Sequence, residues 1–408
     1  MLVAVLAGLL AFTSSALAKH AGALDHSFGA KGFVLTRPAG HRGHANAVAD
    51  GKKNKPVVAG ASGGGFGVVR YTRHGKVDSS FGHDGVQTHF GDGNAEAYGV
   101  DVGRRGAVVA AGQVCHRHTG CFFAVAKYDS KGRLDRGFGN DGRVELGFGT
   151  ADSTATSVAF TRQGKIVVSG YTCRTTVDCD FALAQLLPNG DPDPQFGSSG
   201  DGKVVTSFQD PTGNPIRTRA SVIAIDSRGR IALSGAPSGR WTLLALYKPS
   251  GDLVRSFGQN GKVVASLPNL NGIEGIAADA KDKIVVVGKD SSKRGGRWAL
   301  ARFGKGGNLD SSFGDGGVVV TGFPGPRVAA PLGVAIDSRN RIVVTGTPFF
   351  SLARYQPNGK LNRSFGHDGR VTKTHNLGSA SAVAIDSRNQ PVVAGLNPRR
   401  FAVARFLG

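Results

Sequence analysis

The sequence predicts an all-β fold, a seven-bladed β-propeller of four-stranded antiparallel blades, from three observations. The 408 residues include 62 glycines, and this abundance is typical of β-rich chains with many tight turns. A Phe-Gly pair recurs seven times, at spacings of 53, 57, 58, 61, 56 and 52 residues. Each unit holds four short apolar stretches separated by Gly, Asn, Asp and Ser. The recurring phenylalanines are Phe28, Phe81, Phe138, Phe196, Phe257, Phe313 and Phe365.

The strands of a unit can be read in order from one example. Residues 333–337 (GVAID) form the first strand, the turn SRNR follows, and residues 342–346 (IVVTG) form the second. After a variable loop comes the third strand, 351–355 (SLARY), and a connection of the LDSSFG type leads to a fourth strand such as 318–323 (VVVTGF). Several strands are apolar on both faces, which indicates sheets covered on both sides. Radially packed blades meet this requirement, whereas the lack of a helical period excludes a helical solenoid.

The ends of the chain predict how the ring closes. The chain starts with one strand of the fourth type and ends with one of the third type, so seven complete blades require these two strands to pair. We therefore expect Phe33–Thr36 to lie beside Phe401–Phe406 in the last blade. This pairing would close the ring non-covalently and remove exposed edges. Residues 19–408 are then a single domain of seven repeats, and we expect a monomer.

The first 18 residues, MLVAVLAGLLAFTSSALA, are apolar and end in the A-x-A pattern of a cleavage site, which predicts a signal peptide. The alternative is an uncleaved N-terminal anchor. No other apolar run approaches the ~18 residues that cross a bilayer. We expect a protein that is secreted, extracellular or associated with the cell envelope, with no transmembrane segment after cleavage.

The repeated connections resemble a known bacterial repeat. LDHSFGAKGFVLT, LDRGFGNDGRVELGF and LDSSFGDGGVVVTGF, together with GKIVVSG and FALAQL, are similar to the delta-60 repeat, and the similarity covers about residues 24–408. This chain departs from that repeat in having DSRGR or DSRNR turns where a DGK-like turn is expected. The resemblance implies a propeller-like, often exported protein. It implies no catalytic activity and no catalytic residues.

Two columns of equivalent residues predict packing and ion pairing. Aromatic residues open the third strands, and we expect them to pack between neighbouring blades. Basic residues end the same strands, and an acid follows in the connection, so a structural ion pair within each blade is expected. The unit that has Leu246 in place of the base also has Val254 in place of the acid. The alternative is independent variation, with the acid capping a turn. The basic column is Arg70, Lys127, Arg302, Arg354 and Arg405, with Gln185 as a departure, and the acidic column is Asp25, Asp78, Asp135, Asp193 and Asp310, with Asn362 as a departure.

The four cysteines predict two local disulfides. Cys115 and Cys121, and likewise Cys173 and Cys179, are separated by five residues in the same loop of adjacent units. In an exported protein this repeated placement favours the pairs Cys115–Cys121 and Cys173–Cys179. A zinc site built from neighbouring loops is the alternative, but the C-x5-C spacing is unusual for zinc. We predict no metal site and no cofactor. The FGHDG-type turns also lack the ligand set of a calcium loop.

The predicted ligand-binding residues lie on one face of the propeller. Loops between second and third strands, and loops after fourth strands, share this variable face, where the loops differ in length and composition. Varied loops on a rigid scaffold are where binding residues collect. Their basic residues and the net charge of +21 favour an anionic glycan, a cell-surface polymer or phosphate groups. The alternative is a solvated basic surface. The candidate residues are His41, His44, Arg217, Arg219, Lys293, Arg294, Arg297, Arg327, Arg399 and Arg400, with Arg240 beside them.

Two classes of function remain possible from the sequence. A binding or scaffold module for an anionic surface or a protein partner is the leading hypothesis. A propeller hydrolase or lyase with its site at the channel mouth is the alternative. Asp101 is the candidate for the channel, because six units have alanine at its position. No catalytic residue is predicted, since no Ser/His/Asp order or cofactor motif is present. Export and the lack of interleaved aromatics disfavour nucleic acid.

Overall fold

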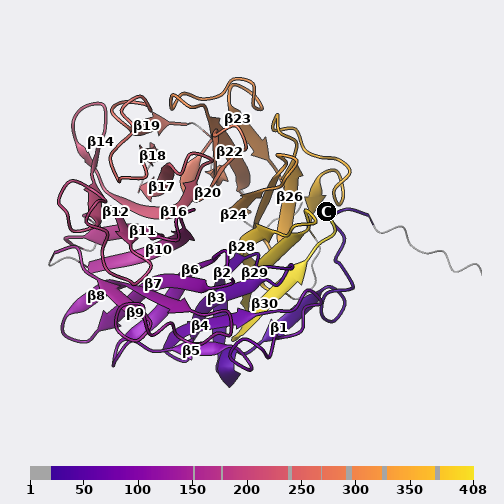
Figure 1. The fold of residues 1–408 in the computed structure, drawn as a ribbon. Coiled ribbons are helices and arrows are strands. Elements are labelled where there is room, and N and C mark those ends of the chain that lie inside the picture. The colour runs from indigo at the N-terminus through magenta and orange to yellow at the C-terminus, as the bar shows by residue number, and fades with distance from the viewer. Residues whose placement is uncertain are drawn as a thin grey trace, which may run out of the picture.

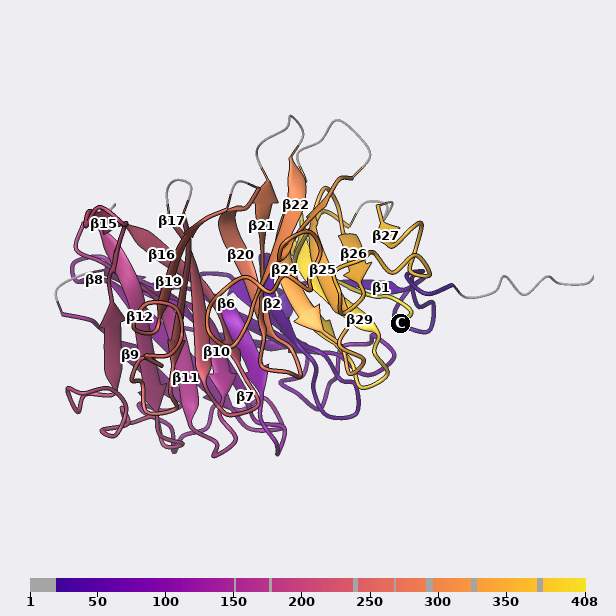
Figure 2. The same ribbon diagram turned by 90° about the horizontal axis from the view of Figure 1, so that it is seen from above.

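The computed structural model describes residues 20–149, 152–175, 178–237, 241–267, 269–290, 296–323, 329–372 and 377–408. In these residues seven four-stranded antiparallel sheets surround a common centre (Figure 1), which confirms the predicted propeller. Seen from the side, the strands run between the two faces of a disc (Figure 2). The described residues contain no helix long and apolar enough to span a bilayer. The predicted signal peptide, residues 1–18, lies outside them.

The four strands of each blade follow one another in chain order from the centre of the ring outward. Blade 1 has β2 (Gly43–Ala49), β3 (Val57–Ser62), β4 (Gly65–Arg70) and β5 (Val86–Thr88). Blade 2 has β6 (Asn94–Val102), β7 (Val108–His116), β8 (Gly120–Tyr128) and β9 (Arg143–Leu146). Blade 3 has β10 (Asp152–Phe160), β11 (Ile166–Cys173), β12 (Cys179–Leu186) and β13 (Lys203–Thr206). Blade 4 has β16 (Thr218–Ile225), β17 (Ile231–Pro237), β18 (Trp241–Tyr247) and β19 (Lys262–Ser266).

The remaining blades have the same arrangement, except that the outermost strand of blade 7 comes from the start of the chain. Blade 5 has β20 (Asn271–Ala278), β21 (Ile284–Asp290), β22 (Arg297–Phe303) and β23 (Val318–Thr321). Blade 6 has β24 (Ala330–Ile336), β25 (Ile342–Thr347), β26 (Ser351–Tyr355) and β27 (Arg370–Val371). Blade 7 has β28 (Ser379–Ile385), β29 (Pro391–Asn397), β30 (Arg400–Arg405) and β1 (Phe33–Thr36). The loops add the short 3-10 helix η1 (Pro38–Gly40) and the small hairpin of β14 (Phe208–Gln209) and β15 (Pro215–Ile216).

The ring closes as the sequence predicts. Strand β1 pairs antiparallel with β30, and Phe33 lies opposite Ala404 and Thr36 opposite Phe401. The segment before β1 continues the closure, because Leu24 bridges to Phe406. The N-terminal strand therefore completes the blade that the C-terminal strands begin.

The hydrophobic core is divided among the seven interfaces between neighbouring blades. The predicted aromatic column lies in these interfaces and is almost wholly buried, apart from the partly exposed Trp241. Burying one such ring contributes about 1.5–3 kcal/mol. The aromatic residues of this column therefore pack the blades together, and their rings are not available to stack against a ligand. Its buried members are Phe66, Phe123, Phe181, Trp298, Phe350 and Phe401.

The recurring Phe-Gly pair joins each blade to the next. The glycine N–H donates a hydrogen bond to a carbonyl in the following blade's turn, as from Gly314 to Asn358 O at 2.9 Å. Gly314 has a φ of +59°, and a Cβ there would lie 2.2 Å from the carbonyl oxygen of Val318. Only glycine meets both requirements. The seven donors are Gly29, Gly82, Gly139, Gly197, Gly258, Gly314 and Gly366.

The turns between first and second strands lie on the face opposite the variable face, which we call the turn face. Hydrogen bonds link these turns from one blade to the next. Backbone N–H groups of blades 4, 5 and 6 donate to a side chain in the next blade's turn, as from Ser338 to Asn389 Oδ1 at 3.0 Å. The hydroxyl of Ser387 in blade 7 donates to Asn54 Oδ1 of blade 1 at 2.6 Å. These contacts give the near-uniform DSRGR-type turns a structural reason to recur. The four acceptors are Asp282, Asn340, Asn389 and Asn54.

The predicted ion pairs form in four blades. In blade 5, Arg302 Nε lies 2.7 Å from Asp310 Oδ2, and the guanidinium carbon lies 4.6 Å from the ring centroid of Phe313. The same side chain donates to the carbonyl of Pro357 in the next blade. The base therefore holds the acid, the phenylalanine and the neighbouring turn together. The confirmed pairs are Arg70–Asp78, Lys127–Asp135, Arg302–Asp310 and Arg405–Asp25.

Three blades depart from that pattern. In blade 3, where Gln185 replaces the base, Asp193 pairs instead with Lys165 at 2.6 Å. Blade 4 has Leu246 and Val254 and needs no pair. In blade 6 the expected pairing fails, because Asn362 carries no charge and no side-chain hydrogen bond joins it to Arg354 in the described structure.

Both predicted disulfides are present. Cys115 is bonded to Cys121 and Cys173 to Cys179, and the described residues contain no free cysteine. Each bond joins residues that lie directly opposite each other in the second and third strands of a blade. The bonds cross-link the ends of the hairpins of blades 2 and 3 on the variable face. Because all four cysteines are disulfide-bonded, they are not available as zinc ligands.

Candidate functional site

The first strands of the seven blades surround the centre of the ring (Figure 1), and each carries a β-bulge. A bulge takes one residue out of the ladder register. Each inner strand thus has one bulged residue, and these residues differ in chemistry. Glu274 is exposed there, yet the surrounding protein desolvates it and raises its pKa. The bulged residues are Asn46, Tyr98, Thr156, Ser221, Glu274, Leu332 and Ser381.

A hydrogen-bonded cluster spans β2 and β6. His44 Nε2 lies 2.7 Å from Glu96 Oε1, and Asn46 Nδ2 donates to the same oxygen at 2.8 Å. Asn46 also donates to the carbonyl of Ala97 at 2.9 Å. Tyr98 is close enough to Glu96 for the two side chains to influence each other's pKa. One carboxylate therefore binds two side chains of blade 1 and lies near the phenol of Tyr98.

This arrangement determines the charge states of the cluster. Burial alone would raise the pKa of Glu96, but the hydrogen bonds from His44 and Asn46, together with the nearby Tyr98, outweigh it and hold the pKa below its ordinary value. The hydrogen bond to Glu96 raises the pKa of His44 against the opposing effect of burial. Burial and the adjacent Glu96 raise the pKa of Tyr98. The cluster thus favours the protonated form of His44 beside the ionised form of Glu96.

The cluster continues into blades 3 and 4. Tyr98 is close enough to Tyr171 of β11 for the two hydroxyls to interact electrostatically. The guanidinium carbon of Arg219, on β16, lies 5.3 Å from the ring centroid of Tyr171, which is within the range of a cation–π contact. His44, Glu96, Tyr98, Tyr171 and Arg219 thus form a continuous row across four blades, which we call the channel-mouth row.

Four more residues, three arginines and a histidine, gather where blades 7 and 1 meet. The N–H of Gly43 donates to Arg399 O, and the N–H of Gly63 donates to Arg42 O, both at 3.3 Å. These bonds hold the loop before β2 against the hairpin tips of both blades. Within the described ranges, neither Arg42, Arg399 nor Arg400 pairs with a carboxylate. We call this set the blade 7–1 patch, and its exposed members are His41, Arg42, Arg399 and Arg400.

The other predicted ligand-binding residues are dispersed. Arg217 is exposed beside the β14–β15 hairpin, next to Arg219. Arg297 forms an ion pair with the buried Asp290 of the neighbouring strand, so it is already neutralised within blade 5. Lys293, Arg294, Arg327 and Arg240 lie outside the described residues.

Asp101 lies on β6, and its carboxylate accepts hydrogen bonds from backbone N–H groups. Its two oxygens accept hydrogen bonds from the N–H groups of Phe160, in the next blade, and Val102, each at 2.8 Å. Burial raises the pKa of Asp101, although these two bonds act in the opposite direction. The carboxyl group thus ties β6 to β10 at the turn-face end of the channel. No group of three or more His, Cys, Asp or Glu side chains suited to a metal occurs in the described part of the chain.

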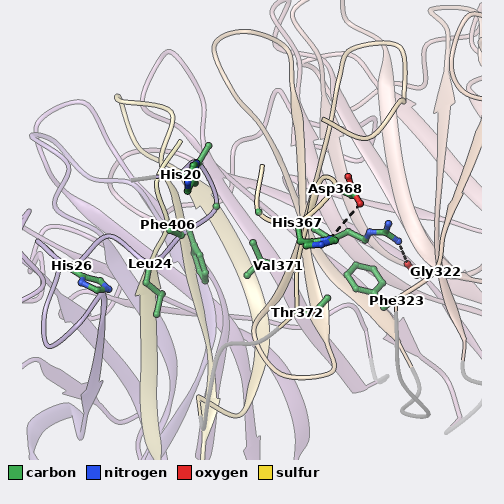
Figure 3. A pocket seen from close by; sticks show the side chains of 15 residues that line it. His20, Leu24, His26, Gly322, Phe323, His367, Asp368, Val371, Thr372 and Phe406 are labelled. Atoms are coloured by element: carbon green, nitrogen blue, oxygen red, sulfur yellow. Dashed lines mark hydrogen bonds and ion pairs between the residues drawn. The ribbon is translucent and has the colours of Figure 1, made fainter. Parts of the chain in front are cut away.

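A cavity of about 970 Å³ lies between blades 6 and 7, away from the channel (Figure 3). Leu24, Phe323, Val371 and Phe406 give it an apolar lining. At its edge, His367 lies 3.5 Å from Asp368, and Arg370 donates to Gly322 O at 2.8 Å. Similar grooves lie between other blades, so this cavity follows from the packing of outer strands in a repeated fold.

Comparison with known proteins supports the repeat and the fold. Residues 164–196 and 282–313 match the family model "Domain of unknown function (DUF5122) beta-propeller". Each segment runs from the turn after a first strand to the phenylalanine of a Phe-Gly pair, so both cover the same part of a blade. The chain is a β-propeller repeat protein. No curated protein matches its sequence.

Solved structures resemble the propeller in fold alone. A catalytically inactive variant of virginiamycin B lyase from Staphylococcus aureus with quinupristin is 11% identical, with a TM-score of 0.55, over 92% of this chain and 99% of that one. The WD40 beta-propeller domain of Doa1 is 12% identical, with a TM-score of 0.51, over 91% and 96%. Proteins of such different function share the fold, so the fold does not assign an activity.

The sequence identified the two ends of the channel-mouth row, His44 and Arg219, but missed its middle. Glu96, Tyr98 and Tyr171 were not singled out, because no motif marks the bulge at Tyr98 or the contacts between blades that bring the three residues together. A signal was present: the position of Glu96 holds His44, Thr154, Arg219, Ala330 or Ser379 in other units, and such unlike residues are expected where packing does not dictate the choice.

Proposed function

We propose that the protein is an exported β-propeller that binds an anionic polysaccharide or cell-envelope polymer on its variable face. The observation that carries this proposal is the blade 7–1 patch. The turn face has exposed arginines without an ion pair of its own, such as Arg104, Arg105 and Arg162, but aspartates hold several of its other arginines. On the turn face, Arg230 and Arg341 pair with aspartates of their own turns at 2.6 Å, and Arg388 pairs with Asp386 at 3.1 Å. In the blade 7–1 patch, the described arginines have no such partner. Cations left unpaired are available to an anionic ligand.

The channel-mouth row gives this face a second cationic feature. The hydrogen bond to Glu96 raises the pKa of His44 and so favours its protonated form, and Arg219 lies over Tyr171. A polymer that crosses from blade 7 toward blade 4 would contact first the patch and then the row. Exposed pairs contribute little singly, so we expect binding that depends on several contacts and weakens with salt.

The proposal extends to the location of the protein and to the family of its repeats. The two disulfides are consistent with an extracellular protein, and we propose export through the leader in residues 1–18. We further propose that the repeats are of the delta-60 type. The positive charge of the variable face would also fit a protein partner with an acidic surface.

Binding to an array of anionic and neutral polysaccharides at rising salt tests the proposal. We expect the variant Arg42→Ser/Arg399→Ser/Arg400→Ser to lose roughly tenfold in affinity for anionic polymers. The matched control Arg104→Ser/Arg105→Ser/Arg162→Ser removes the same charge from exposed positions of the turn face, and it should retain binding. Equal losses in both variants, or no binding at low salt, would refute the proposal.

A propeller hydrolase or lyase is the second candidate function, and the His44–Glu96–Tyr98 contact favours it. A protonated imidazole and a neutral phenol at a channel mouth are groups that can donate protons to a substrate. The test is turnover of anionic glycans and lactones, followed by the release of new chain ends. Turnover that disappears in His44→Asn while binding persists would support an enzyme. Binding without turnover would support the binding module and reject the enzyme.

A further inference from the structure

Gln185, on β12 of blade 3, stands where other blades carry the base of the third strand. Only 3% of its surface is exposed. Its backbone is bonded, since its N–H donates to Gly202 O at 3.0 Å and its carbonyl accepts from the N–H of Asp193 at 2.9 Å. Its side-chain amide, however, has no hydrogen-bond partner in the part of the chain that the structure describes. A buried amide without a partner costs free energy, so this group is suited to binding a ligand.

The side chain of Gln185 lines a cavity of about 670 Å³ between blades 3 and 4. The cavity lies at the turn face, because its other walls are the β10–β11 turn, residues 160–163 and 165, and the β16–β17 turn, residues 225–229 and 231. Pro249, from the turn after β18, completes the lining. Gln185 and Pro249 therefore face one space from two neighbouring blades.

In other blades a base spans this distance. Arg70 Nη1 donates to the carbonyl of Ser130, in the turn of the next blade, at 2.7 Å. Lys127 Nζ donates in the same way to Pro188 O at 2.6 Å. Pro249 holds the same place in its own turn, but no hydrogen bond among the described residues ends on its carbonyl. The carbonyl of Pro249 is therefore available to a donor from outside the chain.

The lysine of blade 3 does not substitute for the base. Lys165 Nζ lies 2.6 Å from Asp193 Oδ2. In blade 5 the equivalent Lys283 lies 2.6 Å from Asp310 Oδ2, and Arg302 Nε lies 2.7 Å from the same oxygen. The lysine and the base thus have separate places beside one aspartate. Blade 3 has the lysine and lacks the base.

Blade 4 lacks the base as well, but it has no polar group in its place. Leu246 and Val254 are both apolar there, so neither calls for a ligand. Blade 3 instead keeps the buried acid Asp193 and the polar side chain of Gln185. The acceptors of a guanidinium group are therefore retained only where a cavity adjoins them.

The charges near the cavity favour a ligand with an anionic end. Arg228 lies 3.3 Å from Asp282, and Arg230 lies 2.6 Å from Asp226, so carboxylates already balance these two arginines. Arg162 lines the cavity, is exposed, and pairs with no carboxylate within the described ranges. A purely cationic ligand would meet this unpaired charge, whereas a carboxylate on that side would pair with it.

We propose that the cavity between blades 3 and 4 binds a small guanidino acid, of the type of arginine. Its guanidinium group takes the role of the base and donates to the carbonyl of Pro249 and the amide oxygen of Gln185. Its carboxylate lies on the side of Arg162. The planar fork of donors on a guanidinium can reach two acceptors at once, which an ammonium group does less well. This site lies on the turn face and does not depend on polymer binding by the variable face.

Titration of the native protein with arginine, citrulline and agmatine, followed by NMR of the backbone amides at 226–229 and 250–251, tests the proposal. Arginine should shift these signals saturably, with a Kd on the order of 1 mM or below. Citrulline has the same length but a neutral urea group, so it should bind at least roughly tenfold more weakly. Agmatine lacks the carboxylate and should bind roughly two- to fivefold more weakly.

Variants of Gln185 show whether the ligand occupies the place of the base. Gln185→Arg restores the base and should weaken the binding of arginine at least roughly tenfold, because its own guanidinium fills the site. Gln185→Leu copies Leu246 and should also weaken binding, since it removes the amide. The control Gln356→Arg adds the same charge at an exposed turn of blade 6 and should bind arginine as the native protein does.

Three results would overturn the proposal. They are the absence of saturable shifts at 226–229 and 250–251, equal affinities for arginine and citrulline, and unchanged binding of arginine in both variants of Gln185. An affinity for agmatine equal to that for arginine would reject the carboxylate contact with Arg162 and so the assignment to a guanidino acid. The two Gln185 variants also separate binding at this site from the general effect of arginine as a cosolute.

Discussion

Gly314 shows how one residue type fixes a contact that recurs in every blade. Its N–H reaches Asn358 of the next blade, its φ is positive, and the carbonyl of Val318 fills the space a side chain would need. The recurrence of Phe-Gly follows from these demands. It is a requirement of ring assembly, and no ligand is needed to explain it.

A pair of glycine substitutions tests this interpretation. Gly314→Ala should lower stability by about 2–3 kcal/mol, because it adds both backbone strain and a collision. Gly316 has a similar φ of +58°, but nothing lies within 4 Å of a Cβ there. Gly316→Ala should therefore cost only about 1 kcal/mol. Urea unfolding measures both, and equal losses would contradict the inter-blade contact.

The charge state of His44 can be tested at the same scale. Glu96→Gln removes the carboxylate that raises the pKa of His44, so the pKa should fall in a titration followed by NMR. The pKa of His116, raised by Glu145 and Asp92, provides the control and should not move. An unchanged pKa of His44 would show that the two side chains do not pair in solution.

The pH window of this pair follows from the two shifts. The pKa of His44 is raised from 6.5, so its contribution to stability is full below 6.5 and is lost as pH rises through the folded-state pKa. The pKa of Glu96 is lowered from 4.5, so its contribution is present above 4.5 and is lost as pH falls through the folded-state pKa. The pair is therefore most stabilising between these two limits.

At the scale of the element, β1 is the strand on which closure depends. It supplies four residues to blade 7 and packs Phe33 and Leu35 against the blade 6–7 core. Replacing residues 32–36 by Gly-Ser-Gly-Ser-Gly should lower the melting temperature by at least about 5 °C. The same replacement at residues 210–214, the tip of the β14–β15 hairpin, should have little effect. Unchanged unfolding of the first variant would overturn the closure.

The elements also show where sequence reasoning succeeds and fails. The seven repeats predicted the strands, the blade boundaries and the pairing of Phe33–Thr36 with the last blade, because averaging over equivalent units suppresses local noise. They also predicted Arg302–Asp310, since a base and an acid were lost together in blade 4. The prediction of an ion pair failed in blade 6, where Asn362 replaces the aspartate and Arg354 is kept. A substitution of the acid alone does not indicate how the structure accommodates the remaining arginine.

The channel-mouth row was harder to predict for a physical reason. Its contacts join residues of different blades, such as His44 and Glu96, that are 52 positions apart. Bulges on the inner strands place Asn46 and Tyr98 beside the channel, and no turn residue signals a bulge. Within the patch, charge composition identified Arg399 and Arg400 correctly as exposed, but it could not distinguish them from Arg297, which is neutralised by Asp290.

At the scale of the whole molecule, the two faces of the disc have different roles. The turn face joins the blades, because its turns bond to one another. Aspartates also pair with some of its arginines, such as Arg230 and Arg341. The variable face carries the disulfide-stapled hairpins, the channel-mouth row and the unpaired cations of the blade 7–1 patch. A net charge of +21 alone would attract anions to any surface. Under our proposal, the cluster of unpaired arginines in the blade 7–1 patch directs them to the variable face.

Hydrogen exchange of the propeller with and without the anionic polysaccharide that binds it most tightly tests this division most directly. We predict protection of residues 37–44, 397–401 and 217–219, which carry the patch and the Arg219 end of the row. The turns at 103–106, 161–164 and 226–230 should exchange as in the free protein. Protection of these turns, with none at 37–44 or 397–401, would contradict the assignment of binding to the variable face.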